Sequence, residues 1–240
     1  MPASTEIQFL DGPHSRLKEL KFVMNTMLDL IRGLRALHFI GPCITVFGSA
    51  RFKDDHPYYQ LTRDAAAAFA KLGFTIITGG GSGLMEAANR GAKDVGGFSV
   101  GCNIQLPVEQ TPNPYLDKWV YMSHFFIRKV LLVKYSFAFV VMPGGYGTLD
   151  EYFEALTLIQ TRKIKNFPII IFGREFHEEL MEHIVVMKRN GTIGDGDESY
   201  FLVTDDINEA VELIKEKSIK QFGLKPKRAY KPFRWLFEHK

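Results

Sequence analysis

The 240-residue sequence lacks the features that mark membrane, secreted and metal-binding proteins. No apolar run approaches the roughly 18 residues of a membrane span. The first six residues have neither the basic nor the apolar region of a secretory signal. The seven histidines show no ligand spacing, and the two cysteines, Cys43 and Cys102, lie far apart in sequence. We therefore expect a cytoplasmic protein without a metal, whose two thiols are free and buried rather than joined in a disulfide.

The common nucleotide-binding motifs are missing as well. No Gly-Lys-Ser/Thr triplet occurs, so there is no loop of the kind that holds a triphosphate with magnesium. The run Gly79–Gly83 lacks the third spaced glycine of the dinucleotide fingerprint. The next apolar segment ends in Cys102-Asn103, with no acid that could bind a ribose diol. These absences disfavour NAD and ATP-driven chemistry and favour a monophosphate ligand.

The composition is that of an ordinary globular protein, with 46% hydrophobic and 24% charged residues. Its net charge of +3 conceals an asymmetry. Residues 218–240 hold seven Lys and Arg against Glu238, a net charge of +6, so residues 1–217 sum to −3. Such a tail could contact nucleic acid or a membrane surface. Its aromatic residues, spaced among prolines, favour a segment that straps the terminus onto its own fold or onto a neighbouring subunit.

Strand-like and helix-like apolar patterns alternate along the chain. We expect strands at 43–47, 74–78, 98–102, 119–122, 137–142, 168–172 and 201–203, and helices at 14–37, 57–72, from 84, 123–134, from 149, 175–189 and from 207 to about 217. This alternation predicts an α/β fold: a doubly wound parallel sheet with right-handed crossovers and helices on both faces.

We expect one domain over residues 1–240. It comprises an N-terminal helical extension (1–38), a nucleotide-binding core (39–217) and a basic aromatic tail (218–240). In the extension, the apolar residues recur at spacings of three and four, and they are Leu17, Leu20, Met24, Met27, Leu28, Ile31 and Leu34. This stripe indicates a helix that packs on the core or on another subunit.

Two glycine turns, Gly79–Gly83 and Gly144–Gly147, follow predicted strands and open predicted helices. Ligands of doubly wound sheets bind at that edge, and a helix N-terminus favours an anion. The second turn therefore predicts a phosphate cradle, with Glu151 in the first turn of its helix. Thr148 and Glu151 also fit a capping box, so a purely structural role stays open for both residues.

Three motifs together resemble the LONELY GUY (LOG) family, long labelled "lysine decarboxylase-like". Pro143-Gly-Gly-Tyr-Gly-Thr-Leu-Asp-Glu151 matches PGGxGTxxE, Arg128-Lys129 stands at the expected spacing upstream, and Thr78-Gly-Gly-Gly-Ser-Gly-Leu-Met-Glu-Ala-Ala-Asn-Arg-Gly91 completes the set. The likeness covers about residues 40 to 217, and the segment 106–115 looks like the longer, type II branch of the family.

The resemblance implies a modified Rossmann fold and a cytokinin riboside 5′-monophosphate phosphoribohydrolase. Such an enzyme acts on N6-prenylated AMP or AMP and releases the free base and ribose 5-phosphate, without a cofactor. It also implies a homodimer unit and, for type II members, often a hexamer. The decarboxylase label has no support in these residues, because that chemistry needs a pyridoxal phosphate Schiff-base lysine and the sequence points to none.

By the same resemblance, Arg128 and Glu151 match the catalytic pair. The substrate-contacting candidates are Gly80, Gly81, Ser82, Glu109, Lys129, Gly144, Gly145, Tyr146, Gly147, Thr148 and Thr157. Breaking an N-glycosidic bond builds positive charge on the ribose, which a carboxylate can stabilise while it activates water. A guanidinium could neutralise phosphate or assist the departing base, although a lone arginine is also compatible with a surface salt bridge.

Two other function classes remain open at this point. A carrier that holds a nucleotide or a molybdenum cofactor without cleaving it needs only the cradle, so the intact Arg128 and Glu151 pair favours the enzyme. The basic tail could anchor nucleic acid, which we regard as the weaker interpretation. The sequence does not identify the preferred base.

Overall fold

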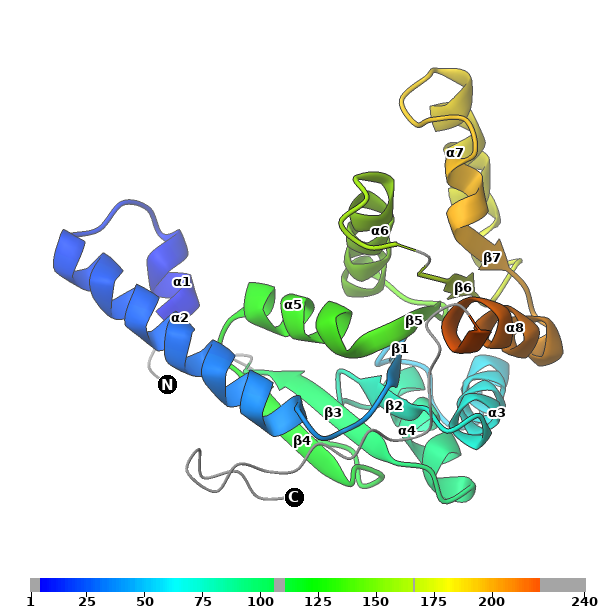
Figure 1. Ribbon diagram of the computed structural model, residues 1–240, viewed down its shortest axis with the longest axis horizontal. Helices are drawn as coiled ribbons and strands as arrows, with labels where there is room; N and C mark the ends of the chain where they lie inside the picture. The colour runs from blue at the N-terminus through cyan, green and yellow to red at the C-terminus, as the bar shows by residue number, and fades with distance from the viewer. Residues whose placement is uncertain (1–4, 106–110, 166, 221–240) are drawn as a thin grey trace.

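The computed structural model describes residues 5–105, 111–165 and 167–220, and it contains one seven-stranded sheet of order β4-β3-β2-β1-β5-β6-β7 (Figure 1). Each neighbouring pair of strands is parallel. The strands are β1 (Cys43–Phe47), β2 (Thr75–Thr78), β3 (Ser99–Ile104), β4 (Lys118–Met122), β5 (Ser136–Val141), β6 (Ile169–Ile171) and β7 (Phe201–Val203).

Helices cover both faces of this sheet, which confirms the predicted doubly wound α/β fold (Figure 1). The helices are α1 (Thr5–Leu10), α2 (Arg16–Leu37), α3 (Pro57–Lys71), α4 (Leu84–Asp94), α5 (Phe125–Tyr135), α6 (Tyr146–Gln160), α7 (Glu178–Arg189) and α8 (Ile207–Ile214). One core cluster joins the sheet to α2, α5, α6 and α7, and the other joins it to α3, α4 and α8. The inner strands β3, β2, β1, β5 and β6 are buried on both faces apart from Phe137, as their continuous apolar runs predict, whereas the edge strands β4 and β7 are partly exposed.

The strand order reverses between β1 and β5, and the two glycine turns meet the loop after β1 at this point. The Ser49 N–H donates to the Pro143 carbonyl at 3.0 Å, and the Leu84 N–H donates to the Ser49 carbonyl at 2.9 Å. The Ser82 hydroxyl donates to the Ala50 carbonyl at 3.0 Å. The carboxyl edge of the sheet, where doubly wound folds bind ligands, is therefore built from three interlocked turns.

All seven expected strands are present, each within two residues of its expected ends. The largest difference is β3, which continues to Ile104 because it pairs with β4 as far as Ile104 and Met122. Asn103 therefore lies inside the sheet, opposite Tyr121, instead of in the following loop. Pairing with a strand that comes later in the chain extended β3, and the local apolar pattern contains no trace of it.

The helix at the N-terminus is confirmed, but its predicted apolar stripe does not pack on the core. Six of the seven stripe residues are exposed in this chain, at 44% to 80%: Leu17, Leu20, Met24, Met27, Leu28 and Ile31. Only Leu34 of the stripe contacts the core cluster. The side that docks on the domain instead contains the buried Asp29, Gly33 and Leu37. A Cβ atom on Gly33 would lie 2.3 Å from Leu131 Cδ1, so α2 approaches α5 closely there.

Both cysteines are free and buried, as expected, and burial raises the pKa of the Cys102 thiol to about 12. Within the described ranges, no helix is long and apolar enough to cross a membrane. Residues 221–240, most of the predicted basic tail, lie outside the described residues.

Candidate active site

A buried polar network shapes the first glycine turn. The Thr78 hydroxyl, at the end of β2, donates to Asn89 Oδ1 at 2.7 Å and accepts from the Gly80 N–H at 2.9 Å. Asn113 donates through Nδ2 to Asn89 Oδ1 and to the Gly81 carbonyl, both at 3.0 Å. The Asn113 N–H donates to the Gly80 carbonyl at 3.0 Å. These bonds hold Gly80 at a φ of +75°, a conformation that a side chain would strain.

The second glycine turn leaves open space above the N-terminus of α6. A Cβ atom on Gly145 or Gly147 would have no neighbour within 4 Å among the described residues, whereas one on Gly144 would lie 2.2 Å from Thr148 Oγ1. Gly144 is therefore required by packing, and Gly145 and Gly147 are not. The first N–H groups of a helix have no intrahelical acceptor, and the dipole makes this end positive. The arrangement suits an anion such as phosphate.

The capping-box interpretation of Thr148 and Glu151 is wrong. The helix α6 begins at Tyr146 with Gly145 as its N-cap, three residues before Thr148, which the box requires at that position. Thr148 consequently lies inside the first turn, and Glu151 lies in the second turn instead of the first. The Glu151 carboxylate is buried, with 4% of the residue exposed, and its Oε2 accepts no hydrogen bond from the part of the chain that is described.

Burial raises the pKa of Glu151 to about 7, against the opposing effect of the nearby Arg128 and Lys129 cations. A carboxylate of this kind changes its charge close to neutral pH, which suits a group that exchanges protons during a reaction. Buried carboxylates without a structural partner are uncommon because desolvation destabilises their charged form. The position of Glu151 therefore indicates function more strongly than its place in the motif does.

Arg128 is not part of a surface salt bridge. Its side chain is 14% exposed, its Nε donates to the Cys102 carbonyl at 2.8 Å, and its Nη1 lies 4.0 Å from Glu151 Oε1. A Cβ atom on Gly79 would lie 2.7 Å from Arg128 Nη2, so the guanidinium rests directly on the first glycine turn. Arg128 thus connects the carboxyl end of β3, the first glycine turn and the Glu151 carboxylate.

The Lys129 ammonium is paired with other carboxylates. Lys129 Nζ lies 3.0 Å from Asp150 Oδ2 and 2.9 Å from Glu154 Oε2, so its ammonium ties α5 to the outer side of α6. Glu109 lies outside the described residues.

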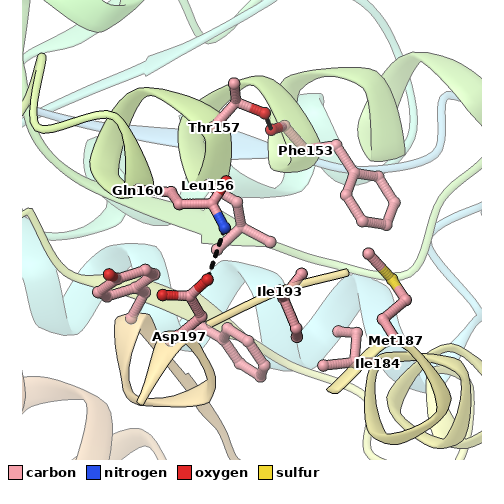
Figure 2. A pocket seen from close by; sticks show the side chains of 10 residues that line it. Phe153, Leu156, Thr157, Gln160, Ile184, Met187, Ile193 and Asp197 are labelled. Atoms are coloured by element: carbon pink, nitrogen blue, oxygen red, sulfur yellow. Dashed lines mark hydrogen bonds between the residues drawn. The ribbon is translucent and has the colours of Figure 1, made fainter. Parts of the chain in front are cut away.

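Thr157 is separate from this centre, in a different environment. It lies six residues beyond Glu151 on α6, about 9 Å along the axis. Its hydroxyl donates to the Phe153 carbonyl at 2.8 Å. Thr157 lies on the rim of a mainly apolar cavity of about 100 Å³ between α6 and α7, together with Leu156, Ile184 and Met187 (Figure 2). The structure thus brings together Arg128, Glu151, both glycine turns and Thr148, and it leaves Thr157 elsewhere.

The N-terminus of α5, which carries Arg128, is held by a residue that sequence reasoning missed. Asp29 of α2 is 3% exposed, and its Oδ2 accepts from the Ser123 N–H at 2.8 Å and lies 3.0 Å from His124 Nδ1. Arg32 approaches the other oxygen at 3.4 Å. The sequence did contain one signal for this role of Asp29. Its carboxylate lies on the same side of α2 as Gly33 and Leu37, away from the exposed stripe.

Asn89, Asn103 and Asn113 were missed for a related reason. An asparagine in a glycine-rich or proline-rich stretch looks like a turn residue, because local sequence does not reveal its burial. All three are at most 6% exposed. Asn89 and Asn113 form the network described above, whereas both polar atoms of Asn103 are without a hydrogen-bond partner among the described residues.

The chain is similar in sequence to one protein family and to several named proteins. Residues 85–214 match the model of a family described as possible lysine decarboxylase. A cytokinin riboside 5′-monophosphate phosphoribohydrolase of Rhodococcoides fascians is 29% identical over 179 residues, 72% of this chain and 88% of that protein. One of the same name from Mycobacterium tuberculosis is 35% identical over 100 residues, 41% of this chain and 54% of that protein.

A third relative is longer. The pyrimidine/purine nucleotide 5′-monophosphate nucleosidase of Escherichia coli is 23% identical over 223 residues, which are 85% of this chain and 47% of that protein. The named relatives thus support glycosidase-type activity at the level of the family.

Solved structures share the fold. A molybdenum cofactor binding protein from Rippkaea orientalis superimposes with a TM-score of 0.56 at 22% identity, over 73% of this chain and 96% of that one. A molybdenum cofactor carrier protein from Chlamydomonas reinhardtii gives 0.55 at 22% identity, over 75% and 99%. At this identity the likeness concerns the fold alone. The match to the family model, which spans more than half of the chain, shows that the protein belongs to the LONELY GUY family, whose model carries the description "possible lysine decarboxylase".

Proposed function

We propose that the protein is a phosphoribohydrolase that cleaves the N-glycosidic bond of nucleoside 5′-monophosphates and releases a free base and ribose 5-phosphate. The names of its relatives support the reaction class: two are called phosphoribohydrolases and one a nucleosidase. AMP and N6-prenylated AMP are the substrates to compare. The two reduced thiols suit a cytoplasmic enzyme.

The observation that carries this proposal is the buried Glu151 carboxylate, whose Oε2 has no partner in the described ranges and which lies close to a guanidinium at the carboxyl edge of the sheet. A carrier protein has no need for such a group, because a buried carboxylate destabilises the fold. Hydrolysis does need it, since positive charge develops on the ribose as the bond to the base breaks.

The groups suggest an order along the substrate. The phosphate binds at the N-terminus of α6, where Gly145, Gly147 and Thr148 surround open space. The ribose then lies over Glu151, one turn further along the same helix. Arg128 then contacts the substrate beyond the ribose, where the base departs. In the reaction the C1′–N bond breaks, its electron pair goes to the base, and a water oxygen attacks C1′ while Glu151 accepts a proton from that water. The base nitrogen then takes up one proton from solvent and Glu151 releases its proton to solvent. Arg128 stabilises the negative charge on the departing base.

The test is product analysis with purified protein, AMP and isopentenyladenosine 5′-monophosphate, beside a Glu151→Gln variant. We expect free base and ribose 5-phosphate from the wild type and at least a 100-fold lower rate from the variant. The ratio of the two rates identifies the preferred base. If the wild type binds either nucleotide without releasing base, the carrier interpretation replaces the hydrolase, and the fold shared with molybdenum cofactor carriers then indicates the ligands to try next.

A further inference from the structure

Asn103, at the end of β3, has a side chain that the described chain does not satisfy. The residue is 1% exposed, and neither its Nδ2 nor its Oδ1 has a hydrogen-bond partner among the described residues. Leaving a buried amide unpaired is costly, so such a group usually has a ligand, a water molecule or a functional reason.

The contrast with its neighbours is sharp. Asn89 and Asn113, buried beside the same glycine turn, each form hydrogen bonds through both polar atoms of their side chains. Buried asparagines in this region are therefore bonded wherever they serve the fold. Asn103 differs from them, because its amide has no partner among the described residues and is available for a bound molecule.

The amide is placed against the proposed active site. A Cβ atom added to Gly80 would lie 2.6 Å from Asn103 Oδ1, so the side chain lies directly against the first glycine turn. The preceding residue, Cys102, gives its carbonyl to Arg128 Nε, and the same guanidinium reaches to 4.0 Å from Glu151. The backbone of β3 beside Asn103 is thus linked through one guanidinium to the Glu151 carboxylate.

The position of Asn103 indicates which part of a bound nucleotide its amide would contact. If the phosphate binds at α6 and the ribose over Glu151, the next group along a nucleotide is its base. A carboxamide presents a donor and an acceptor side by side. That pair matches the N7 acceptor and the N6–H donor of adenine, but not the two acceptors N7 and O6 of hypoxanthine or guanine. An N6-substituted adenine keeps one N6–H and can still be read in this way.

We propose that Asn103 recognises the base of the substrate, accepting from the exocyclic N6–H and donating to N7, and so selects 6-aminopurines over 6-oxopurines. This inference rests on the proposed function for the orientation of the nucleotide. Because a hydrogen bond donated to N7 stabilises the negative charge that the departing base takes up, the same bond would also help the reaction.

The first test compares AMP and IMP as substrates for the wild type and for Asn103→Leu, which keeps the size of the side chain and removes both polar atoms. We expect the wild type to favour AMP, and the variant to lose roughly 10- to 100-fold in kcat/KM for AMP while changing little for IMP. Asn103→Asp, which keeps the acceptor for N6–H and loses the donor to N7, should lower kcat/KM for both nucleotides and keep the preference for AMP. An unchanged AMP/IMP ratio in Asn103→Leu overturns the proposal.

The second test needs no catalysis. In the ligand-free protein, Asn103→Leu should melt at the same temperature as the wild type or higher, because an unsatisfied amide is replaced by an apolar group. The stabilisation that saturating AMP gives to the wild type should be reduced in the variant. A lower melting temperature of the ligand-free variant shows that the chain itself satisfies the amide, and this result overturns the proposal.

The two tests separate this inference from the proposed function. If the wild type does not cleave AMP but is stabilised by AMP and less so by IMP, and Asn103→Leu loses the difference, the base-recognition role stands and the hydrolase fails. If the wild type cleaves AMP and IMP equally well, the hydrolase stands and the role of Asn103 fails.

Discussion

The Glu151 carboxylate combines a functional position with a cost to stability. Its pKa is about 7 in the folded protein, against an ordinary value of 4.5, so the folded state retains the proton over a range in which the unfolded chain has lost it. The contribution of this proton to the free energy of unfolding is fully present below pH 4.5 and is lost as the pH rises through 7. A shift of this size corresponds to roughly 3 kcal/mol at most.

We therefore expect Glu151→Gln, which stays neutral, to match the wild type in free energy of unfolding at pH 4 and to exceed it by about 1 to 3 kcal/mol at pH 8. Urea unfolding at the two pH values measures this difference. The control is Glu179→Gln on the exposed side of α7, whose difference from the wild type should not change over the same range. A Glu151→Gln variant that is equally destabilised at both pH values would contradict the burial argument.

The same titration should govern activity. If Glu151 acts as an anion and proton acceptor, kcat/KM for AMP rises with pH along a limb whose midpoint is near 7. Removing the adjacent cation in Arg128→Met should move this limb to higher pH, because Arg128 opposes the rise in the pKa of Glu151. A pH profile of each protein measures both effects. A limb that does not move in the variant would show that Glu151 and Arg128 are not electrostatically linked.

Alanine substitutions at two glycines of the second turn separate an effect on ligand binding from an effect on packing. Gly147→Ala has free space around the added methyl group and lies in a helix, so stability should stay equal or rise by up to about 1 kcal/mol. The KM for AMP should rise, since the methyl group stands where the ligand approaches. Gly144→Ala collides with Thr148 Oγ1 and should lower the melting temperature. Thermal melts and steady-state kinetics distinguish the two, and an unchanged KM in Gly147→Ala would argue against the phosphate cradle.

At the scale of elements, α2 reaches the active site through α5. Asp29 accepts from the Ser123 N–H and pairs with His124, and both residues precede the helix that carries Arg128. The N-terminal extension therefore does more than cover the sheet. It fixes the end of α5, where the free N–H groups of the helix favour a negative charge.

Asp29→Ala should lower the free energy of unfolding by about 2 to 4 kcal/mol, because it leaves buried donors unpaired. We also expect a lower kcat for AMP hydrolysis, since Arg128 loses its fixed position. Asp29→Asn retains an acceptor for the Ser123 N–H and should recover most of both losses. Glu19→Ala, an exposed change in the first turn of α2, is the control. If Asp29→Ala has wild-type stability, the link between α2 and α5 is not important.

At the scale of the whole molecule, the exposed apolar surface is concentrated on two neighbouring helices. The stripe lies on α2, Phe125, Phe126 and Val130 are exposed on α5, and the two helices lie side by side (Figure 1). Apolar residues gathered in this way usually mark an interface. We propose that this surface joins copies of the chain into a homo-oligomer, which is the second of the two roles that the helical stripe predicts.

Replacing Leu20 and Met24 together by Glu should then reduce the size of the particle in solution, measured by light scattering after size-exclusion chromatography. Both side chains are exposed in the single chain, so the monomer should stay folded by circular dichroism. Lys21→Glu, on the same helix outside the stripe, should leave the assembly intact. A wild type that is monomeric at tens of micromolar would refute the interface.

The sequence by itself determined the layers of this protein and the edge of the sheet at which we propose that it binds a ligand. Alternating apolar runs predict all seven strands within two residues, and the glycine turns at the ends of β2 and β5 predict the ligand-binding edge. These features are local, because a strand, a turn and a helix N-terminus are each written in a short stretch of residues. The motif of the second turn likewise identifies the family.

Tertiary structure decided the properties that depend on residues far apart in sequence. The burial of Glu151 and its pKa near 7 depend on the packing of α6 and on Arg128 of α5, and the same motif was equally compatible with a helix cap. The unpaired amide of Asn103 appears only when β3 extends against β4 and Gly80 closes over it. Likewise, only docking through Asp29 and Gly33 reveals that the apolar stripe of α2 faces outward. Charge, burial and exposure are sums over spatial neighbours, and a linear pattern does not specify them.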